Sequence, residues 1–345
     1  MTNKIIITTI MLLCTIIRAD DKNIFSNYRE ETELAVENGL KYLIAVQHPD
    51  GNFPGNYGDS TGIVSLVGMS FLSKGYSPDT GKYSTFLQQC IKFVINSQRK
   101  NGLLATEDSR NEVMYSHNIS TLFLSEVNGM VPENLQKQIS ETLPKAIRLI
   151  LASQQVKKEP KYQGGWRYFP NSKDSDLSCS GWALMALRSA KLNGAPIPDN
   201  AIESAISYIL KNSNFDTGTF GYMDNRTHNK TLTGAGLLSL EIAGMHGHEI
   251  SKKSGDYILT VFSIPMNWQY YGNYYNSQAM FQLGGKYWEK FANWYYPKYL
   301  NMQQPNGSWH SNMVSDVYAT AMTILALTVP YRQLPIYQRD ETVSK

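Results

Sequence analysis

The stretch Gln303-Gln-Pro-Asn-Gly307-Ser-Trp309 carries the pattern on which the fold of this 345-residue chain depends. Its spacing, a glutamine followed four residues later by glycine and two further on by an apolar or aromatic residue, recurs at 47–53 and 98–104. Weaker copies end at Gly164-Gly165-Trp166 and at Phe220. The glycines permit a turn with positive φ, and the aromatic side chain is expected to fold back onto the preceding helix. A recurring turn of this kind predicts a repeated structural unit.

Two kinds of helical segment flank the repeated turn. Those before it are amphipathic: in 199–211 the apolar residues fall on one stripe, at Ile202, Ala205, Ile206, Ile209 and Leu210. Those after it, such as 178–192, 232–244 and 316–328, carry Ala, Gly, Ser and Leu on most faces, which is typical of helices packed on all sides. The sequence therefore predicts outer helices that alternate with buried inner ones.

The pattern predicts an all-α fold, because strand-like alternation is scarce along the chain. Six outer helices are expected near 30–46, 84–98, 141–155, 199–211, 252–262 and 287–302. Six inner helices are expected near 60–73, 116–128, 177–192, 231–244, 273–283 and 316–328. Six such hairpins form either an open solenoid or a closed ring, and the periodicity alone does not choose. We expect one domain over 28–335, followed by a tail over 336–345.

The composition excludes several classes of protein. With 42% hydrophobic and 18% charged residues the chain is globular rather than disordered. The net charge is +3, and near +1 once the N-terminal Lys4 and Arg18 are discounted, so nothing indicates a nucleic-acid partner. Three cysteines exclude a disulfide-rich scaffold and a four-cysteine metal module. Cys90 and Cys179 are expected to be buried free thiols, with one disulfide as the alternative.

The N-terminal segment resembles a secretory signal peptide. Lys4 precedes an apolar run over 5–17, and Arg18 and Ala19 follow it. The run is too short to span about 30 Å of hydrocarbon. We therefore expect cleavage after Ala19, so that 1–19 is removed and the protein is exported to the periplasm or the extracellular space. The mature form is expected to have no stable membrane span, which leaves peripheral association with a membrane open.

The repeated motif resembles the QW-type signature, Q-x3-G-x-W, of the prenyltransferase and squalene-oxidase repeat proteins, and above all their single-domain, squalene-cyclase-like exported bacterial members. The resemblance covers nearly the whole chain after residue 19. It also includes Gly164-Gly-Trp-Arg-Tyr168, the stretch 174–187, the stretch 278–288 and Leu334-Pro-Ile-Tyr-Gln-Arg339. It implies a closed α6/α6 toroid of six helical hairpins, whose parallel inner helices all begin at one face, which we call the mouth. The same fold serves cyclases, protein prenyltransferases and binding domains.

The resemblance suggests an acid. Cyclases of this family use a D-x-D-D run, in which one carboxylic acid protonates a polyene, and the matching residues here are Asp174-Ser-Asp176-Leu177. Leu177 replaces the last Asp of the run, so the partner that would tune the acid is missing. If Asp176 is buried it can still act as the acid, because desolvation raises the pKa of a carboxyl group and keeps it protonated. The alternative is that Asp174, Asp176 or Ser178 caps the third inner helix.

Metal and cofactor chemistry find no support in the sequence. Protein prenyltransferases hold zinc with Asp, Cys and His, but here Asp176 and Cys179 have the wrong spacing, and Ala319 stands where the third ligand should be. Two ligands do not make a zinc site. The glycine-loop, serine-elbow and zinc-protease motifs are also absent from the sequence. We therefore expect no metal and no cofactor.

The remaining candidates lie at or just before the starts of the inner helices. They are Asp59, Tyr115, His117, Asp176, Arg226, Asn273, Tyr274, Asp316 and Tyr318. Asp59 and Asp316 fit helix caps best. His117 opens an otherwise apolar helix, so it is either a site residue or a buried histidine with satisfied hydrogen bonds. We assign catalysis to Asp176 and His117, and ligand contact to Asp174, Tyr115, Trp182, Tyr274, Tyr318 and Asp316.

The aromatic content indicates the class of ligand. The chain has 22 Tyr and 6 Trp, concentrated over 268–275 and 287–296. Tyr and Trp suit a cavity with apolar walls and polar tips, although many aromatics only wedge helices apart. The leading hypothesis is an isoprenoid-binding toroid that performs acid-initiated cyclisation or isomerisation. The alternatives are a non-catalytic binding or scaffold protein, and a carbohydrate-cleaving toroid enzyme that uses Tyr, His and an acid pair.

Overall fold

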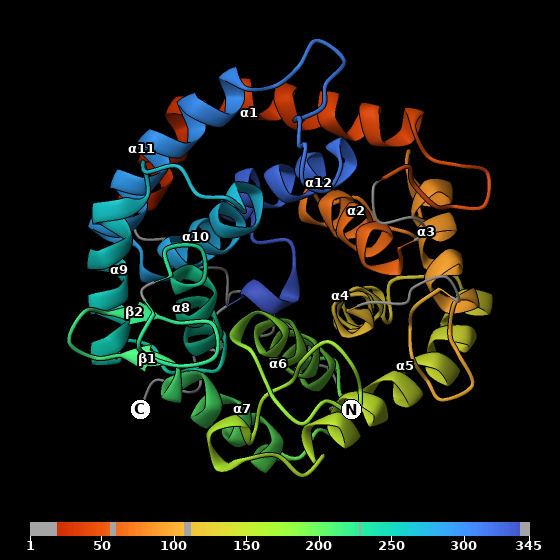
Figure 1. Cartoon of the computed structure of the whole chain (residues 1–345). Helices are drawn as coiled ribbons and strands as arrows, with labels where there is room; N and C mark the ends of the chain where they lie inside the picture. Colours follow the sequence, from red (N-terminus) through yellow and green to blue (C-terminus); the bar gives the residue numbers. More distant parts are fainter. Residues whose placement is uncertain (1–18, 56–59, 107–111, 228, 339–345) are drawn as a thin grey trace, which may run out of the picture.

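The computed structural model describes residues 19–55, 60–106, 112–227 and 229–338. Within them the chain forms twelve α-helices in alternating outer and inner positions (Figure 1). The outer helices are α1 (Ala19–Ala45), α3 (Ser84–Asn96), α5 (Glu133–Gln154), α7 (Asp199–Lys211), α9 (Glu249–Val261) and α11 (Gly285–Asn301). The inner helices are α2 (Thr61–Ser73), α4 (Val113–Val127), α6 (Leu177–Leu192), α8 (Thr233–Ile242), α10 (Gln269–Leu283) and α12 (Asp316–Leu327).

The remaining regular structure is short. Strands β1 (Ser213–Asn214) and β2 (Thr219–Phe220) pair antiparallel in the loop after α7. Three 3₁₀ turns, η1 (Pro160–Tyr162), η2 (Val329–Tyr331) and η3 (Pro335–Tyr337), lie in the connections and after α12. The all-α class predicted from the sequence is therefore confirmed. No helix among the described residues is long and apolar enough to cross a membrane.

The inner helices close into a ring. Helices α2, α4, α6, α8, α10 and α12 pack in that order, and α12 packs back against α2 (Figure 1). Outside this ring α11 packs against α1. The choice between solenoid and ring, which the periodicity left open, is thus settled as a ring.

The inner helices run parallel. At their N-terminal ends the hydroxyl groups of Ser60 and Ser116 are 3.5 Å apart, which brings the starts of α2 and α4 together. At the opposite ends Thr328 donates a hydrogen bond of 2.8 Å to Ser73. Tyr115 and Ser178 likewise join the starts of α4 and α6, Arg188 Nε donates to Ile242 O at 3.0 Å at the ends of α6 and α8, and Ser277 Oγ donates to Ala326 O at 2.7 Å between the later turns of α10 and α12. The inner helices therefore all begin at the mouth, and we call the opposite face, where they end, the floor.

The glutamine of the repeated turn ties neighbouring outer helices together. Gln98 Nε2 donates to Gly102 O at 3.2 Å and to Thr142 O of α5 at 3.0 Å. Gln303 Nε2 makes the same pair of bonds, to Gly307 O at 2.9 Å and to Ala35 O of α1 at 2.7 Å. The amide thus both closes its own turn and fastens it to the next outer helix. At Gln303 this bond joins the last outer helix to the first.

The glycine and the aromatic residue of the turn have equally specific places. Gly307 has φ +89°, and a Cβ there would lie 2.4 Å from Asn38 O of α1, so only glycine fits. Trp309 Nε1 donates to Tyr299 O of α11 at 2.7 Å, and Trp166 Nε1 donates to Ile150 O of α5 at 2.8 Å. The predicted fold-back of the aromatic side chain onto the preceding helix is confirmed at both tryptophans.

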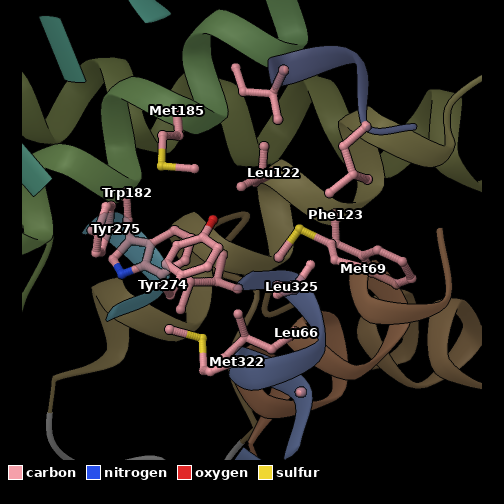
Figure 2. Packing of buried hydrophobic residues seen from close by; sticks show 14 of the residues in the cluster. Leu66, Met69, Leu122, Phe123, Trp182, Met185, Tyr274, Tyr275, Met322 and Leu325 are labelled. Carbon is pink, nitrogen blue, oxygen red and sulfur yellow. The ribbon is translucent and has the colours of Figure 1, made fainter. Parts of the chain in front are cut away.

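Side chains from five of the inner helices fill the ring centre (Figure 2). The labelled members are Leu66, Met69, Leu122, Phe123, Trp182, Met185, Tyr274, Tyr275, Met322 and Leu325, and each is at most 2% exposed. A cavity wide enough for an isoprenoid would leave its wall side chains accessible. The hypothesis of an aromatic-lined cavity left open whether the ring is hollow, and here large Met, Trp and Tyr side chains occupy its centre.

Several boundaries differ from those expected, above all the start of α1, which lies at Ala19 rather than near 30. Helix α5 begins at Glu133 rather than near 141, because Leu135 and Ile139 extend its buried stripe through a polar stretch. The expected tail over 336–345 begins too early, since Ile336 and Tyr337 are buried against the ring. Residues 1–18 of the signal peptide expected over 1–19 lie outside the described residues.

Candidate active site at the mouth of the ring

Asp176 is the N-cap of α6. Its Oδ1 accepts hydrogen bonds from the Cys179 backbone N–H at 2.8 Å and from Ser178 Oγ at 2.6 Å. The backbone of Asp176 also bridges to Trp166 in the preceding turn, which fixes the start of the helix. The capping interpretation is thus confirmed. The cap uses Oδ1, and Oδ2 takes no part in it.

The second oxygen of Asp176 is buried without a hydrogen bond. The side chain is 0% exposed, no described residue donates a hydrogen bond to Oδ2, and Arg167 Nε lies 3.9 Å from it. Burial raises the pKa of this carboxyl group to about 6, against the opposing effects of the hydrogen bonds from Cys179 and Ser178 and the charge of Arg167. A carboxyl group with this pKa stays protonated up to a higher pH than an exposed aspartate does.

Arg167 covers Asp176 from the solvent side. Its guanidinium lies 4.5 Å from the ring centre of Tyr168 and 5.5 Å from that of Tyr222, as cation–π contacts. Arg167 Nη1 is also 3.5 Å from Asp174 Oδ2, whose side chain is 40% exposed. Asp174 therefore holds Arg167 at the surface, while Asp176 lies beneath it.

A tyrosine is linked to the acid by hydrogen bonds. Tyr115 OH donates to Ser178 Oγ, which in turn donates to Asp176, so the three form a hydrogen-bonded chain across the starts of α4 and α6. Burial raises the pKa of Tyr115 well above its usual value, and the charge of Asp176 adds to the effect. Burial also raises the pKa of Tyr271 well above its usual value, and the charges of Tyr318 and Asp176 raise it further. The side chains of Tyr115, Ser178 and Asp176 thus lie together at the starts of α4 and α6, and Tyr318 lies in the first turn of α12.

Tyr271 was not among the residues singled out. It lies in the first turn of α10, within the aromatic stretch 268–275, and its ring is 4.8 Å from that of Tyr275. The signal was present, since Tyr271 precedes Tyr275 by four residues and such residues share one helix face. The sequence alone did not show which of the clustered tyrosines face the axis.

His117 has a different place from the one that catalysis would require. Its Nδ1 accepts from the Leu104 backbone N–H at 3.0 Å, and its Nε2 lies 3.2 Å from Ala146 O of outer helix α5. Burial lowers the pKa of the ring to about 4, so at neutral pH the imidazole is uncharged and Nε2 donates to Ala146. Both ring nitrogens are therefore occupied by backbone groups outside the mouth, which corresponds to the structural alternative.

Trp182 and Tyr274 lie deeper along the ring axis. Their rings stack with centroids 5.6 Å apart and planes 13° from parallel, and Tyr275 meets Trp182 edge-on at 5.5 Å (Figure 2). They belong to the packed ring centre between mouth and floor. A ligand that enters from the mouth would meet Tyr115 and Tyr271 before it reaches this stack.

The other expected mouth residues lie away from the axis. Asp316 Oδ1 accepts from the Ser311 N–H at 3.0 Å and pairs with His310 Nδ1 at 2.9 Å, while Ser315 caps α12. Asp316 thus shapes the loop before α12, and neither the expected ligand contact nor the expected cap role fits that position. Asn273 donates to Tyr299 OH of an outer helix. Arg226 is exposed, and Asp59 lies outside the described residues.

The described part of the chain contains two cysteine thiols. Cys90 and Cys179 are both buried and free, as the preferred interpretation predicted. Burial raises the pKa of both thiols, to about 12 for Cys90, so neither is a reactive thiolate at neutral pH. No group of three or more His, Cys, Asp or Glu side chains within the described residues could hold a metal ion.

Comparison with known sequences gives one distant relative. No family model matches the chain. Drimenyl diphosphate synthase from Streptantibioticus cattleyicolor is 24% identical over 191 residues, which cover 55% of this chain. The matched part is 32% of that relative's own length, so the similarity concerns a minor share of the synthase.

Comparison with solved structures shows the fold. A variant of the type II terpene cyclase MstE from Scytonema, in complex with geranylgeranyl dihydroxybenzoate, has TM-score 0.54 and 12% identity, with 88% of this chain and 98% of that chain covered. A protein from Actinoplanes has TM-score 0.53 and 13% identity, with 87% and 99% covered. A reducing end xylose-releasing exo-oligoxylanase has TM-score 0.54 and 11% identity, with 92% and 95% covered.

The chain therefore has a terpenoid-cyclase-like α/α toroid fold. A terpene cyclase and a xylan-cleaving enzyme resemble it equally well in backbone shape. The fold consequently does not choose between isoprenoid and carbohydrate chemistry, and the choice rests on the side chains at the mouth.

Proposed function

We propose that the protein binds an isoprenoid-like molecule in the toroid and that Asp176 protonates it, which starts a cyclisation or isomerisation. The observation that carries this proposal is that Asp176 is fully buried at the mouth, near Tyr115, and that its Oδ2 accepts no hydrogen bond from the described residues. The drimenyl diphosphate synthase and the terpene cyclase MstE support the ligand class.

The proposed reaction conserves the atoms of the substrate. The protonated carboxyl group of Asp176 gives its proton to a terminal carbon–carbon double bond, which leaves a carbocation. A second double bond attacks that cation and closes a ring, or the cation loses a neighbouring proton directly. Either route returns one proton to the carboxylate, so the product is an isomer of the substrate. The faces of Tyr115 and Tyr271 would stabilise the cation.

Two features set the strength of this acid. Leu177 stands where cyclases of the resembled family have a further aspartate, and Arg167 lies beside Oδ2. Arg167 favours the ionised carboxylate and lowers the pKa of Asp176, so a smaller fraction of Asp176 is protonated at neutral pH than burial alone would give. Substrate must also displace side chains from the filled ring centre before it can reach the stack of Trp182 on Tyr274.

The direct test is incubation of the purified protein with geranylgeraniol, followed by gas chromatography and mass spectrometry. The wild type should form a product of unchanged mass and altered retention time. Asp176→Asn should abolish this product, and Asp174→Asn, which removes only the outer partner of Arg167, should retain it. Equal product from the wild type and Asp176→Asn would overturn the role of Asp176.

The pH dependence of turnover provides a second test. With a pKa of about 6, the protonated fraction of Asp176 falls about tenfold per pH unit above that value. The rate should therefore decline from pH 6 to pH 8. Because Arg167 lowers this pKa, Arg167→Gln should move the decline to higher pH, whereas an unmoved profile would contradict the assignment of the acid.

A non-catalytic scaffold is the second candidate, and the filled ring centre favours it. In that case neither geranylgeraniol binding nor product formation should occur. The carbohydrate-cleaving alternative needs two carboxyl groups that flank a sugar, and Asp174 and Asp176 form such a pair only with Arg167 between them. Release of xylose from xylo-oligosaccharides, lost in both Asp→Asn variants, would favour it over isoprenoid chemistry.

We also propose export as the setting for this function, on the strength of Lys4 and the apolar run over 5–17. Mass spectrometry of the protein from the native cell envelope or medium tests this. A mature chain that begins at residue 20 is expected.

A further inference from the structure

The segment Leu334-Pro-Ile-Tyr-Gln338, which the sequence singled out and the proposed chemistry does not use, lies inside the floor of the ring. We call it the floor plug. Leu334, Ile336 and Tyr337 are 3%, 3% and 7% exposed, and the 3₁₀ turn η3 packs against α6. In Figure 1 the dark-blue end of the chain returns to the middle of the ring. The ring itself is already closed without the plug, by α12 against α2.

Side chains from two inner helices, α10 and α4, hold the plug by polar contacts, and a serine of α6 supports one of them. Tyr337 OH is hydrogen-bonded to Tyr274 OH of α10. Gln282 Nε2, also from α10, donates to Tyr337 O at 2.8 Å. The Ile336 N–H donates to Glu126 Oε2 of α4 at 3.4 Å, and Ser189 Oγ of α6 donates to Glu126 Oε1.

Glu126 is an unusual residue for this position. Its side chain is 1% exposed near the end of α4, and no cation is paired with it among the described residues. Burial raises the pKa of this carboxyl group to about 7. A buried carboxyl group that loses its partner is costly, so any molecule that takes the place of the plug has to bring a hydrogen-bond donor to Oε2.

The backbone before the plug is strained. Arg332, between η2 and the plug, has φ +52°, one of two non-glycine residues with positive φ among those described. Its guanidinium lies 5.0 Å from the ring centre of Phe281. A residue other than glycine in this region stores conformational strain that a changed backbone path would release.

We propose that the floor plug occupies a ligand chamber of its own ring and is displaced by a neutral isoprenoid alcohol. The apolar part of the ligand would replace the side chains of Ile336 and Tyr337 against Tyr274, and its hydroxyl group would replace the Ile336 N–H as donor to Glu126. A prenyl diphosphate would bring negative charge to a buried carboxyl group and is therefore rejected. The class of ligand rests on the proposed function, whereas the displacement does not depend on Asp176.

Equilibrium dialysis with tritiated farnesol tests the proposal. In the wild type the plug competes with the ligand, so Tyr337→Ala should bind farnesol at least tenfold more tightly than the wild type. Tyr337→Phe, which keeps the ring and loses the hydroxyl group, should fall between the two. Farnesyl diphosphate should not compete in any of them. A folded Tyr337→Ala that binds farnesol no better than the wild type would overturn the proposal.

Hydrogen exchange on the wild type provides the test that needs no variant. Farnesol should accelerate exchange of the amides in 334–338 at least tenfold and leave those of α12 unchanged. Unchanged or increased protection of 334–338 with bound farnesol would refute displacement. On the wild type, displacement is measured by hydrogen exchange and conversion by mass spectrometry, so the two results are independent. Displacement without any isomerised product would therefore contradict the role of Asp176 alone, and product without displacement would contradict the plug alone.

Discussion

Asp176 combines a structural task with the proposed chemical one, and its two oxygens divide them. Oδ1 caps α6 through the Cys179 N–H, and Oδ2 faces Arg167 without a hydrogen bond. The cap requires only a side-chain oxygen that accepts hydrogen bonds, which asparagine also has. Proton donation requires the acid itself. The two tasks can therefore be separated by substitution at one position.

Asp176→Asn and Asp176→Ala should differ in stability. Asparagine keeps the acceptor for the Cys179 N–H, so its free energy of unfolding should stay within about 0.5 kcal/mol of the wild type. Alanine removes the cap and leaves a buried N–H unpaired, which should cost about 1–2 kcal/mol. Urea unfolding followed by circular dichroism measures both. Equal losses in the two variants would show that the charge, rather than the cap, stabilises α6.

Glu126 predicts a stability that declines with rising pH. Its folded-state pKa is raised from 4.5 to about 7, so folding favours the protonated form. The raised pKa of Glu126 adds about 3 kcal/mol to the free energy of unfolding below pH 4.5. This stabilisation is lost as the pH rises through 7. Glu126→Gln should therefore gain stability relative to the wild type between pH 5 and pH 8 in urea unfolding. The exposed Glu141→Gln serves as control, and a parallel pH response of both variants would refute the assignment.

At the scale of the element, the repeated turn acts as a fastener between outer helices. Gln98 and Gln303 each donate to one carbonyl of their own turn and one of the next outer helix. Gln154 repeats this with Gly164 O and Ala201 O across a longer insertion. These three amides share one hydrogen-bonding geometry, which explains why a glutamine and a positive-φ glycine occur together in the motif.

Gln303→Ala should weaken the seam at which the ring closes. It leaves the carbonyls of Ala35 and Gly307 without their side-chain donor, which should cost about 1–3 kcal/mol in the free energy of unfolding. Gln304→Ala, one position on, is the matched control and should change stability by less than about 0.5 kcal/mol. Chemical denaturation compares them, and similar values for both would contradict the fastening role.

The helices were predictable from the sequence because their signals are local. Apolar stripes defined the outer helices, and the bounds of α6 and α7 agree with the prediction to the residue. The start of α5 was missed because Leu135 and Ile139 are separated by polar residues. The burial of Ile336 and Tyr337 was missed because it depends on contacts with α4, α6 and α10, far away in the sequence.

The candidate site was only partly predictable for the same reason. Asp176, Tyr115 and Tyr318 could be placed at the mouth because helix starts can be located from the pattern. Which way a side chain points is set by neighbours: His117 faces the backbone of α5 and of the preceding turn, which the sequence of α4 does not reveal. The packing of the ring centre likewise depends on five inner helices at once.

At the scale of the whole molecule, the ring has an acid at each end. Asp176 lies at the mouth and Glu126 at the floor, with the stack of Trp182 on Tyr274 along the axis between them. Side chains fill this axis in the described conformation, and the floor plug closes one end. Binding of an isoprenoid therefore requires rearrangement of side chains rather than insertion into an existing cavity.

The central claim is that the ring takes an isoprenoid and that Asp176 converts it. The most direct measurement is mass spectrometry of organic extracts from the wild type and Asp176→Asn after incubation with geranylgeraniol. The account predicts geranylgeraniol bound to both proteins, and an isomer of the same mass and different retention time from the wild type alone. Absence of bound isoprenoid from both proteins would contradict the claim, and the same isomer from both would contradict the role of Asp176.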